Sequence, residues 1–398
     1  MRSLGRLAGL RYTAAAMANF NEILGFLRAR EAEMVRLLGE LVRIESSTFD
    51  KAGVDRVGRK LAEEWRQRGA RVEFMRQRER GNHLRAELWL GRGKPAGQIL
   101  VLGHTDTVYE RGALAKSPFH IAGGRAYGPG TLDMKGGLVN ALFAVDALRA
   151  AQAEPRSRFV FLWTSDEEVG SESSQMFIEK EARRSSAVLV LEPGTGAAGK
   201  LKTERKAIGG FEVKVTGRAA HAGVNPQDGD NAVHELALQI ARIVKFNDAR
   251  RGITVNADVV SGGARSNVIA ASAHAAIDAR AVRLADMQRL VKKMRALRPI
   301  LDGAKIEVSG GLDRPPMERR ISAGLFKKAR ALAGEMGFAV EGSLSGGGSD
   351  GNLTAALGVP TLDGLGAVGA GAHTPGEYVT TKFLPQRAAL LAALLASL

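Results

Sequence analysis

Residues 98–107 read Gln98-Ile-Leu-Val-Leu-Gly-His-Thr-Asp-Thr107, an apolar run that passes directly into a polar loop. Consecutive apolar residues bounded by a turn signal indicate a buried strand. His104 and Asp106 then stand where that strand ends. In open α/β sheets, functional groups gather at the carboxyl ends of the strands. The segment therefore predicts an α/β domain with a site at the strand ends.

The same arrangement recurs twice further along the chain. Arg158 to Thr164 is an apolar strand pattern followed by Ser165-Asp166-Glu167-Glu168, and Ala187 to Leu191 is followed by Glu192-Pro193-Gly194. A helical pattern from Gly136 to Ala150 lies between the first two strands. Parallel strands joined by helices bring their carboxyl ends to one edge. We therefore expect the acidic residues and His104 to meet there.

The pattern changes after about Lys202. Strand and helix signals then follow in the order β-α-β-β-α-β, which is typical of a ferredoxin-like domain. We expect a two-domain protein: residues 1–18 form a leader, residues 19–203 and 316–398 form the catalytic domain, and residues 204–315 form an inserted domain. The inserted elements are expected at Gly210–Thr216, Asn231–Phe246, Gly252–Val260, Val268–Val282, Ala285–Leu297 and Lys305–Ser309.

Composition narrows the class of function. The net charge of +15 would suit a nucleic-acid binder, but the basic residues are dispersed and aromatic residues make up only 5 %. We therefore expect no nucleic-acid partner. The chain has no cysteine, so any metal must be held by histidines and carboxylates.

The first residues resemble a poor signal peptide, because Arg6 and Arg11 interrupt the apolar stretch. Met17 is an alternative start. No run approaches the roughly 18 apolar residues of a membrane helix. We expect a cytoplasmic protein without a membrane partner, with a disordered leader and with periplasmic export as the alternative.

Five residues have the composition of a two-metal hydrolase site, with two imidazoles and three carboxylates. A pair of divalent metals needs one bridging carboxylate, terminal ligands on each metal and a base for the water. Nitrogen and oxygen ligands suit Zn²⁺, with Co²⁺ or Mn²⁺ as alternatives. The five expected ligands are His104, Asp133, Glu168, Glu192 and His373.

Two further carboxylates have expected roles beside these ligands. Asp106 lies two residues after His104 and so faces the same way on an extended segment, where it can accept from the second ring nitrogen. Glu167 and Glu168 are adjacent, and spacing does not decide which binds metal. We assign Glu168 to metal and Glu167 to general base and acid.

The chain resembles the zinc aminopeptidase/deacylase superfamily, in the branch of carboxypeptidase G and glutamate carboxypeptidase, related to acetylornithine deacetylase and aminoacylase. The resemblance spans about residues 30 to 390. It is carried by Gly103-His-Thr-Asp-Thr-Val108, Tyr127-Gly-Pro-Gly-Thr-Leu-Asp-Met-Lys-Gly136, Ser165-Asp-Glu-Glu-Val-Gly170, Leu191-Glu-Pro193, Gly217-Arg-Ala-Ala-His-Ala222, Gly346-Gly-Gly-Ser-Asp350 and Gly371-Ala-His-Thr-Pro-Gly-Glu377.

For the catalytic domain, the resemblance implies a zinc-exopeptidase-like fold with two Zn²⁺ per subunit. His104 and Glu192 would hold one zinc, Glu168 and His373 the other, and Asp133 would bridge them. It also implies a cis peptide bond after Asp133.

For the inserted domain, the resemblance implies a lid that also forms a homodimer. His221 would reach across the dimer interface to polarise the scissile carbonyl. Asn267, Arg280 and Arg314 would contact the substrate or the tetrahedral intermediate, and a guanidinium can grip a carboxylate with two hydrogen bonds. Gly347, in the loop 346–348, would let the backbone approach the substrate.

The expected function is therefore amide hydrolysis by a di-zinc metallohydrolase. It would release a C-terminal, acidic (glutamate-like) amino acid from an N-acyl amino acid or short peptide. The alternatives in the same superfamily are an N-acetyl amino-acid deacylase and an aminopeptidase-type dipeptidase. An alternative from another class is a non-catalytic metal-stabilised binding protein, which the loss of a ligand or of Glu167 would have favoured.

Overall fold

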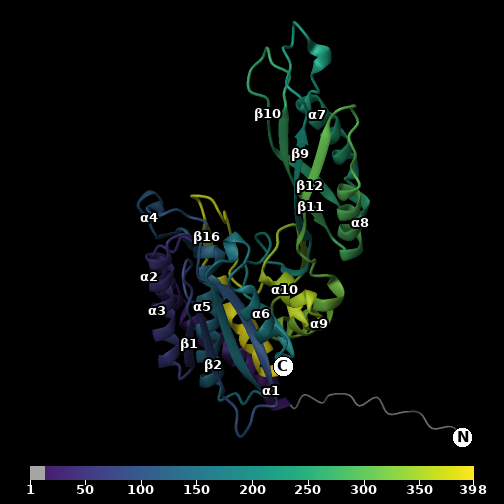
Figure 1. Ribbon diagram of the computed structural model, residues 1–398. Coiled ribbons are helices and arrows are strands. Elements are labelled where there is room, and N and C mark those ends of the chain that lie inside the picture. Colours follow the sequence, from purple (N-terminus) through teal and green to yellow (C-terminus); the bar gives the residue numbers. More distant parts are fainter. Residues whose placement is uncertain (1–13) are drawn as a thin grey trace, which may run out of the picture. The chain divides into compact units, whose positions relative to one another are not determined.

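The computed structural model describes residues 14–398, with side chains from Phe20 onwards (Figure 1). Most of the expected leader, residues 1–13, lies outside the described residues; the rest begins helix α1 (Ala14–Ala29). The chain divides into two compact units. Unit 1 contains the chain up to Leu201 together with Gly324–Gly342 and Val359–Leu398, and unit 2 contains Lys202–Ala323 and Ser343–Gly358.

Unit 1 is built on a six-stranded sheet in the order β1-β2-β6-β3-β7-β14. The parallel part of this sheet consists of β6, β3, β7 and β14. Strand β2 pairs antiparallel with β6, and β1 pairs antiparallel with β2. The parallel strands are continuously apolar because both their faces are buried. The strands are β1 (Arg71–Met75), β2 (His83–Leu88), β3 (Gly97–His104), β6 (Ser157–Thr164), β7 (Ala187–Val190) and β14 (Thr361–Leu362).

Helices complete the core of unit 1, where α5 and α11 pack against each other and against α1. The first two helices, α1 and α2, are separated by a break at Arg30, whose guanidinium pairs with Glu33 and Asp146. The remaining helices are α2 (Glu31–Val42), α3 (Lys51–Gln67), α4 (Ala113–Lys116), α5 (Gly136–Ala150), α6 (Gln175–Ala182), α9 (Arg319–Glu335) and α11 (Phe383–Ser397). Among the helices of residues 14–398, none is long and apolar enough to cross a bilayer.

A second, smaller sheet in unit 1 joins segments that are far apart in the sequence. Its order is β15-β16-β5-β4. The pairing of Tyr378 with Tyr127 sets the loop that contains His373 beside the loop that contains Asp133. The strands are β4 (His120–Ala122), β5 (Arg125–Tyr127), β15 (Gly369–Ala370) and β16 (Tyr378–Thr380).

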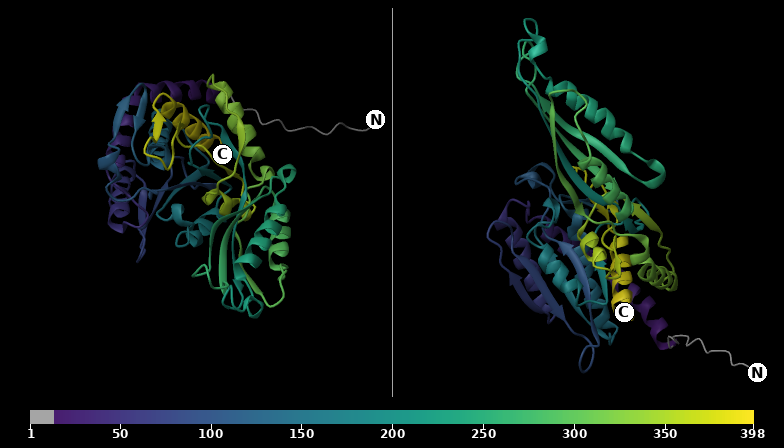
Figure 2. Two further views of the ribbon diagram at one scale, coloured as in Figure 1. Left: turned by 90° about the horizontal axis from the view of Figure 1, so that it is seen from above. Right: turned by 45° about the vertical axis from the view of Figure 1, so that its right-hand side comes forward.

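Unit 2 has the expected β-α-β-β-α-β order, with an antiparallel sheet arranged β10-β11-β9-β12. Alternate residues of β9 and β11 are buried under the two helices, which lie on one face of the sheet (Figure 2). The elements are β9 (Ala207–Thr216), α7 (Ala232–Ile243), β10 (Thr254–Gly262), β11 (Ser272–Ala281), α8 (Leu284–Arg295) and β12 (Lys305–Arg314).

Unit 2 extends beyond the expected inserted domain, residues 204–315, to Lys202 and Ala323, and it also includes Ser343–Gly358. Ser343–Gly358, expected in the catalytic domain, packs with unit 2. Strand β13 (Gly342–Ser345) pairs with β8 (Leu201–Arg205), and helix α10 (Asp350–Ala356) follows. The Asn352 side chain donates to the carbonyl oxygens of Lys206 and Pro315. These hydrogen bonds hold the returning chain against unit 2.

Candidate metal centre

The candidate site lies where three neighbouring strands of unit 1 end. Strand β3 ends at His104, which pairs with Thr164 at the end of β6, and the turn containing Glu167 and Glu168 follows. Strand β7 runs parallel to β3 on the other side and leads into Glu192. Because these strands are adjacent and parallel, their carboxyl ends present the side chains to one place.

The five expected ligands form two histidine-centred sets that share Asp133. His104 Nε2 lies 3.2 Å from Asp133 Oδ1 and 3.5 Å from Glu192 Oε1. His373 Nε2 lies 3.3 Å from Asp133 Oδ2 and 3.4 Å from Glu168 Oε2. Asp133 therefore turns one carboxylate oxygen toward each imidazole, as a carboxylate that bridges two cations would.

The residues of this cluster fit a pair of divalent cations. Ligand atoms of His104, Asp133 and Glu168 lie within 4.8 Å of one another, and so do those of His104, Glu167 and Glu192. The second oxygen of Glu168, Oε1, is buried and has no hydrogen-bond partner among residues 14–398. A buried carboxylate oxygen without a donor is costly unless a cation or a water satisfies it.

The pKa values of these groups reflect the concentration of negative charge. Burial by itself would lower the pKa of His104, but hydrogen bonds with Asp106, Asp133 and Glu192 raise it well above its usual value. Asp133 and Glu168 raise the pKa of His373 to about 10. Burial raises the pKa of Glu168, partly offset by His373. The cluster thus favours bound positive charge, which divalent cations would supply.

Asp106 connects His104 with the Glu167–Glu168 turn. Nδ1 of His104 is 2.9 Å from the main-chain oxygen of Asp106 and 3.4 Å from its carboxylate, so the main-chain oxygen is the closer acceptor. The carboxylate accepts from the Thr48 hydroxyl at 2.8 Å and is 3.4 and 3.3 Å from the main-chain nitrogens of Glu167 and Glu168. Thr48 was not among the expected site residues, since no local pattern distinguishes it.

Asp133 lies in an irregular turn, the π-helical segment η1 (Thr131–Lys135). The peptide bond from Asp133 to Met134 is cis, as the family resemblance implied. Met134 is buried, with its sulfur 3.2 Å from the main-chain nitrogen of His104. The side chain of Glu377 accepts hydrogen bonds from the same turn. Glu377 stands in a motif that was recognised in the sequence, but no role was expected for it.

In unit 2 the structure brings His221 and Asn267 together. His221 bridges to Val268, and the main-chain nitrogen of Ala222 donates to the Asn267 carbonyl. Nδ1 of the exposed His221 ring accepts from the main-chain nitrogens of Gly223 and Val224. The proton of a neutral His221 ring is therefore on Nε2, which leaves Nε2 as a hydrogen-bond donor.

Arg280, Arg314 and Gly347 form a second group in unit 2. Arg280 and Arg314 both pair with Ile208, one on each side of β9, so they share a face of the sheet. Arg280 binds the carboxylate of Asp278 at 2.7 Å. Arg314 is 7 % exposed and lies 3.4 Å from the Asp350 carboxylate. The Gly347 carbonyl accepts from a buried guanidinium, that of Arg205.

These two groups of unit 2 lie at opposite ends of one sheet. Ile208 and Thr216 are eight residues apart on β9, which at about 3.4 Å per residue separates them by about 27 Å. His221 follows the Thr216 end, while Arg280 and Arg314 flank Ile208. His221 and the two arginines of one subunit therefore lie toward opposite ends of that strand.

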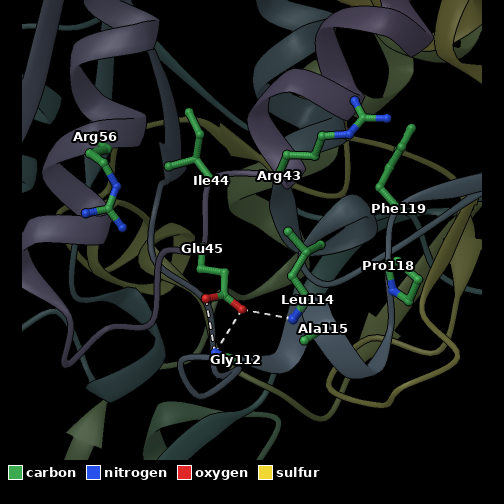
Figure 3. A pocket seen from close by; sticks show the side chains of 9 residues that line it. All are labelled: Arg43, Ile44, Glu45, Arg56, Gly112, Leu114, Ala115, Pro118 and Phe119. Carbon is green, nitrogen blue, oxygen red and sulfur yellow. Dashed lines mark hydrogen bonds between the residues drawn. The ribbon is translucent and has the colours of Figure 1, made fainter.

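A pocket of about 610 Å³ opens in unit 1 beside α2 and α4 (Figure 3). The Glu45 carboxylate within it accepts from the main-chain nitrogens of Gly112 and Leu114. Arg43 lies over the Phe119 ring at 4.9 Å. None of the expected site residues lines this pocket. The hydrogen bonds to Glu45 hold the loop that follows β3.

Histidines outside the cluster have other contacts. His83 is buried between the hydroxyl groups of Ser165 and Ser173. His120 stacks on Tyr127, and His274 contacts Glu212.

Comparisons with known proteins identify the family of this chain. A sequence model of peptidase family M20/M25/M40 matches residues 100–397. Carboxypeptidase G2 from Pseudomonas sp. (strain RS-16) is 31 % identical over 394 residues, covering 97 % of this chain and 94 % of that protein. Succinyl-diaminopimelate desuccinylase from Stenotrophomonas maltophilia (strain R551-3) is 28 % identical over 358 residues, covering 85 % and 92 % respectively.

Solved structures share the fold. A dinuclear metal binding peptidase of the M20 family from Bacillus subtilis superposes with a TM-score of 0.71 at 15 % identity, covering 93 % of this chain and 98 % of that one. The family match extends over most of the chain and includes every expected metal ligand. This chain therefore belongs to peptidase family M20/M25/M40 and is a metal-binding hydrolase of amide bonds.

Proposed function

We propose that this chain is a di-zinc hydrolase that releases a C-terminal, glutamate-like amino acid from an N-acyl amino acid or a short peptide. One observation carries the two-metal part of the proposal: the two oxygens of Asp133 face His104 and His373 separately, at 3.2 and 3.3 Å. A single metal would need only one of these two contacts.

In this proposal His104 and Glu192 would hold one zinc, His373 and Glu168 would hold the other, and Asp133 would supply one oxygen to each. When bound, two zinc ions polarise the substrate carbonyl and make a water molecule more acidic. Asp106 fixes the His104 ring from the opposite side, through both its main-chain oxygen and its carboxylate.

Glu167 is the proposed general base and acid. Its carboxylate lies in the same close group as His104 and Glu192, and its main-chain nitrogen faces the Asp106 carboxylate. Glu167 takes a proton from the attacking water as the water oxygen bonds to the carbonyl carbon. It returns that proton to the amide nitrogen as the C–N bond breaks, so a carboxylic acid and an amine leave, which become a carboxylate and an ammonium group at neutral pH.

Residues of unit 2 supply substrate recognition in this proposal. Nε2–H of His221 donates to the carbonyl oxygen, where negative charge develops. Arg280 and Arg314, with Gly347, recognise the substrate, and the guanidinium groups favour a carboxylate. Asn267 lies beside His221 and contacts the substrate together with it. The separation of about 27 Å along β9 supports a homodimer in which His221 serves the site of the other subunit.

Two findings bear on the released amino acid. The similarity to carboxypeptidase G2 over nearly the whole chain supports release of a C-terminal residue. The presence of two arginines on one face of unit 2 supports a substrate with more than one carboxylate, hence an acidic amino acid. The similarity to a desuccinylase supports the second candidate, removal of a short acyl group from an amino acid.

A substrate panel tests the proposal and separates the candidates. The zinc-loaded protein would be given folyl-, benzoyl- and acetyl-glutamate beside neutral and basic analogues, with Glu167→Ala as the inactive control. Release of glutamate from the aromatic acyl substrates, abolished in Glu167→Ala, is expected. A preference for acetyl or succinyl substrates would favour the deacylase, and release of only neutral or basic amino acids would contradict the role of the arginines.

A further inference from the structure

Glu377 is a buried carboxylate that holds the turn on which Asp133 stands. Its side chain is 1 % exposed. Oε2 accepts from the main-chain nitrogen of Gly130 at 3.0 Å. Oε1 accepts from those of Leu132 at 2.6 Å and Asp133 at 2.9 Å. Three donors from one turn converge on this carboxylate, and one of them belongs to the residue with oxygens facing both imidazoles.

Glu377 also connects this turn to the loop that contains His373 and to the loop that follows His104. Glu377 is four residues after His373, and its main-chain nitrogen donates to the Thr374 carbonyl at 3.1 Å. The Tyr109 hydroxyl contacts Glu377 and lies 2.8 Å from the Thr374 oxygen. Tyr109 is five residues after His104. Segments from three distant parts of the sequence thus meet at one carboxylate.

Hydrogen bonds from main-chain N–H groups to a buried carboxylate are charge-assisted and short, so they hold a loop more firmly than neutral contacts do. Partners outside the ligand set orient the ligands and commonly control metal affinity. Here the turn is irregular and lacks the repeating hydrogen bonds of a long helix, so Glu377 supplies acceptors that secondary structure does not.

We propose that Glu377 is a positioning residue that holds Asp133 in the orientation in which its two oxygens serve two different metals. The inference rests on the proposed two-metal function. Glu377 touches neither metal nor substrate in this proposal, and it acts through the backbone of Asp133 and through the loop that contains His373.

The informative substitution is Glu377→Gln, which keeps the size of the side chain. One carboxylate oxygen becomes an NH₂ group, so a donor faces at least one main-chain N–H of the turn. We expect the affinity for the metal pair to fall by about 10- to 100-fold. Glu45→Gln is the matched control, because Glu45 also accepts main-chain N–H groups, from Gly112 and Leu114, on a segment without a proposed ligand.

Zn²⁺ affinity would be measured on metal-depleted protein by competition with a chromophoric chelator, and Co²⁺ loading would give a visible spectrum that reports ligand geometry. Circular dichroism and Tm would report the fold. Loss of affinity with a changed Co²⁺ spectrum in Glu377→Gln, and neither change in Glu45→Gln, supports the inference. Wild-type affinity in Glu377→Gln, or equal losses in both variants, overturns it.

Tyr109→Phe is a second variant for the case in which Glu377→Gln does not fold. It removes only the hydroxyl contact and leaves the three main-chain donors in place, so a smaller loss, about tenfold or less, is expected. An unchanged affinity in this folded variant would then contradict the inference. Failure of the wild-type protein to bind two metals would contradict the proposed function itself, before any variant is compared.

Discussion

Gly366→Ala should damage the metal centre by displacing Glu192. A Cβ added to Gly366 would lie 2.0 Å from the Leu191 carbonyl oxygen and 2.9 Å from that of Glu192. Contacts below 3.0 Å are essentially not found for Cβ atoms, so the backbone must shift by about 1 Å. The main-chain nitrogen of Gly366 also donates to the Glu192 carbonyl at 2.9 Å, so a shift of this loop also acts on Glu192.

The surroundings leave little room for that shift. Leu191 is fully buried at the end of β7, and close-packed interiors transmit such strain. A misplacement of about 1 Å can lower a reaction rate by about 10²-fold, or about 2.7 kcal/mol. Overpacking should also lower the free energy of unfolding by about 1–3 kcal/mol.

The assay is kcat/KM for N-acyl-glutamate hydrolysis, with Tm and zinc content measured in parallel. Gly324→Ala in α9 is the matched control, because no atom of the described part of the chain lies within 4 Å of a Cβ built there. That control should keep full activity and gain about 0.5–1 kcal/mol of stability. Wild-type kcat/KM and zinc content in Gly366→Ala would refute the inference that the absence of a side chain at residue 366 keeps Glu192 in position.

Three other predictions concern the proposed chemistry. Glu167→Gln should lower kcat by about 10²- to 10⁴-fold with both metals retained; loss of metal in this variant would instead make Glu167 a ligand. Mixing inactive Glu167→Ala and His221→Ala subunits should restore about a quarter of the sites, if dimers form at random and His221 acts on the partner; no recovery would place His221 in its own subunit's site. Because the pKa of His373 is about 10, its ring is protonated at pH 7 before metal binds. Metal binding at pH 7 should therefore release at least one proton, and the apparent affinity should rise with pH; calorimetry in buffers of different ionisation enthalpy measures this, and a proton count of zero would contradict it.

Local patterns were sufficient for the parallel strands β3, β6 and β7 of unit 1 and for the order of elements in unit 2. Apolar runs ending in His104, Glu167–Glu168 and Glu192 predict three neighbouring strands, and the structure has them adjacent and parallel. The β-α-β-β-α-β order of unit 2 was equally visible, because strand and helix periodicities are local properties. The segment Ser343–Gly358 was assigned to the other domain, because its pairing with β8 is a contact between distant parts of the sequence.

The sequence by itself determined which residue types could hold two metals and that His104, Glu168 and Glu192 follow the ends of strands. Only the tertiary structure decided how they are oriented: Asp133 faces both imidazoles, and Glu377 holds its turn from 244 residues away. Spacing cannot reveal such contacts, because the two segments meet only when β16 pairs with β5. Thr48 is another example, since its hydroxyl reaches Asp106 across 58 residues. The identity of a side chain is local, but its orientation depends on packing between distant segments.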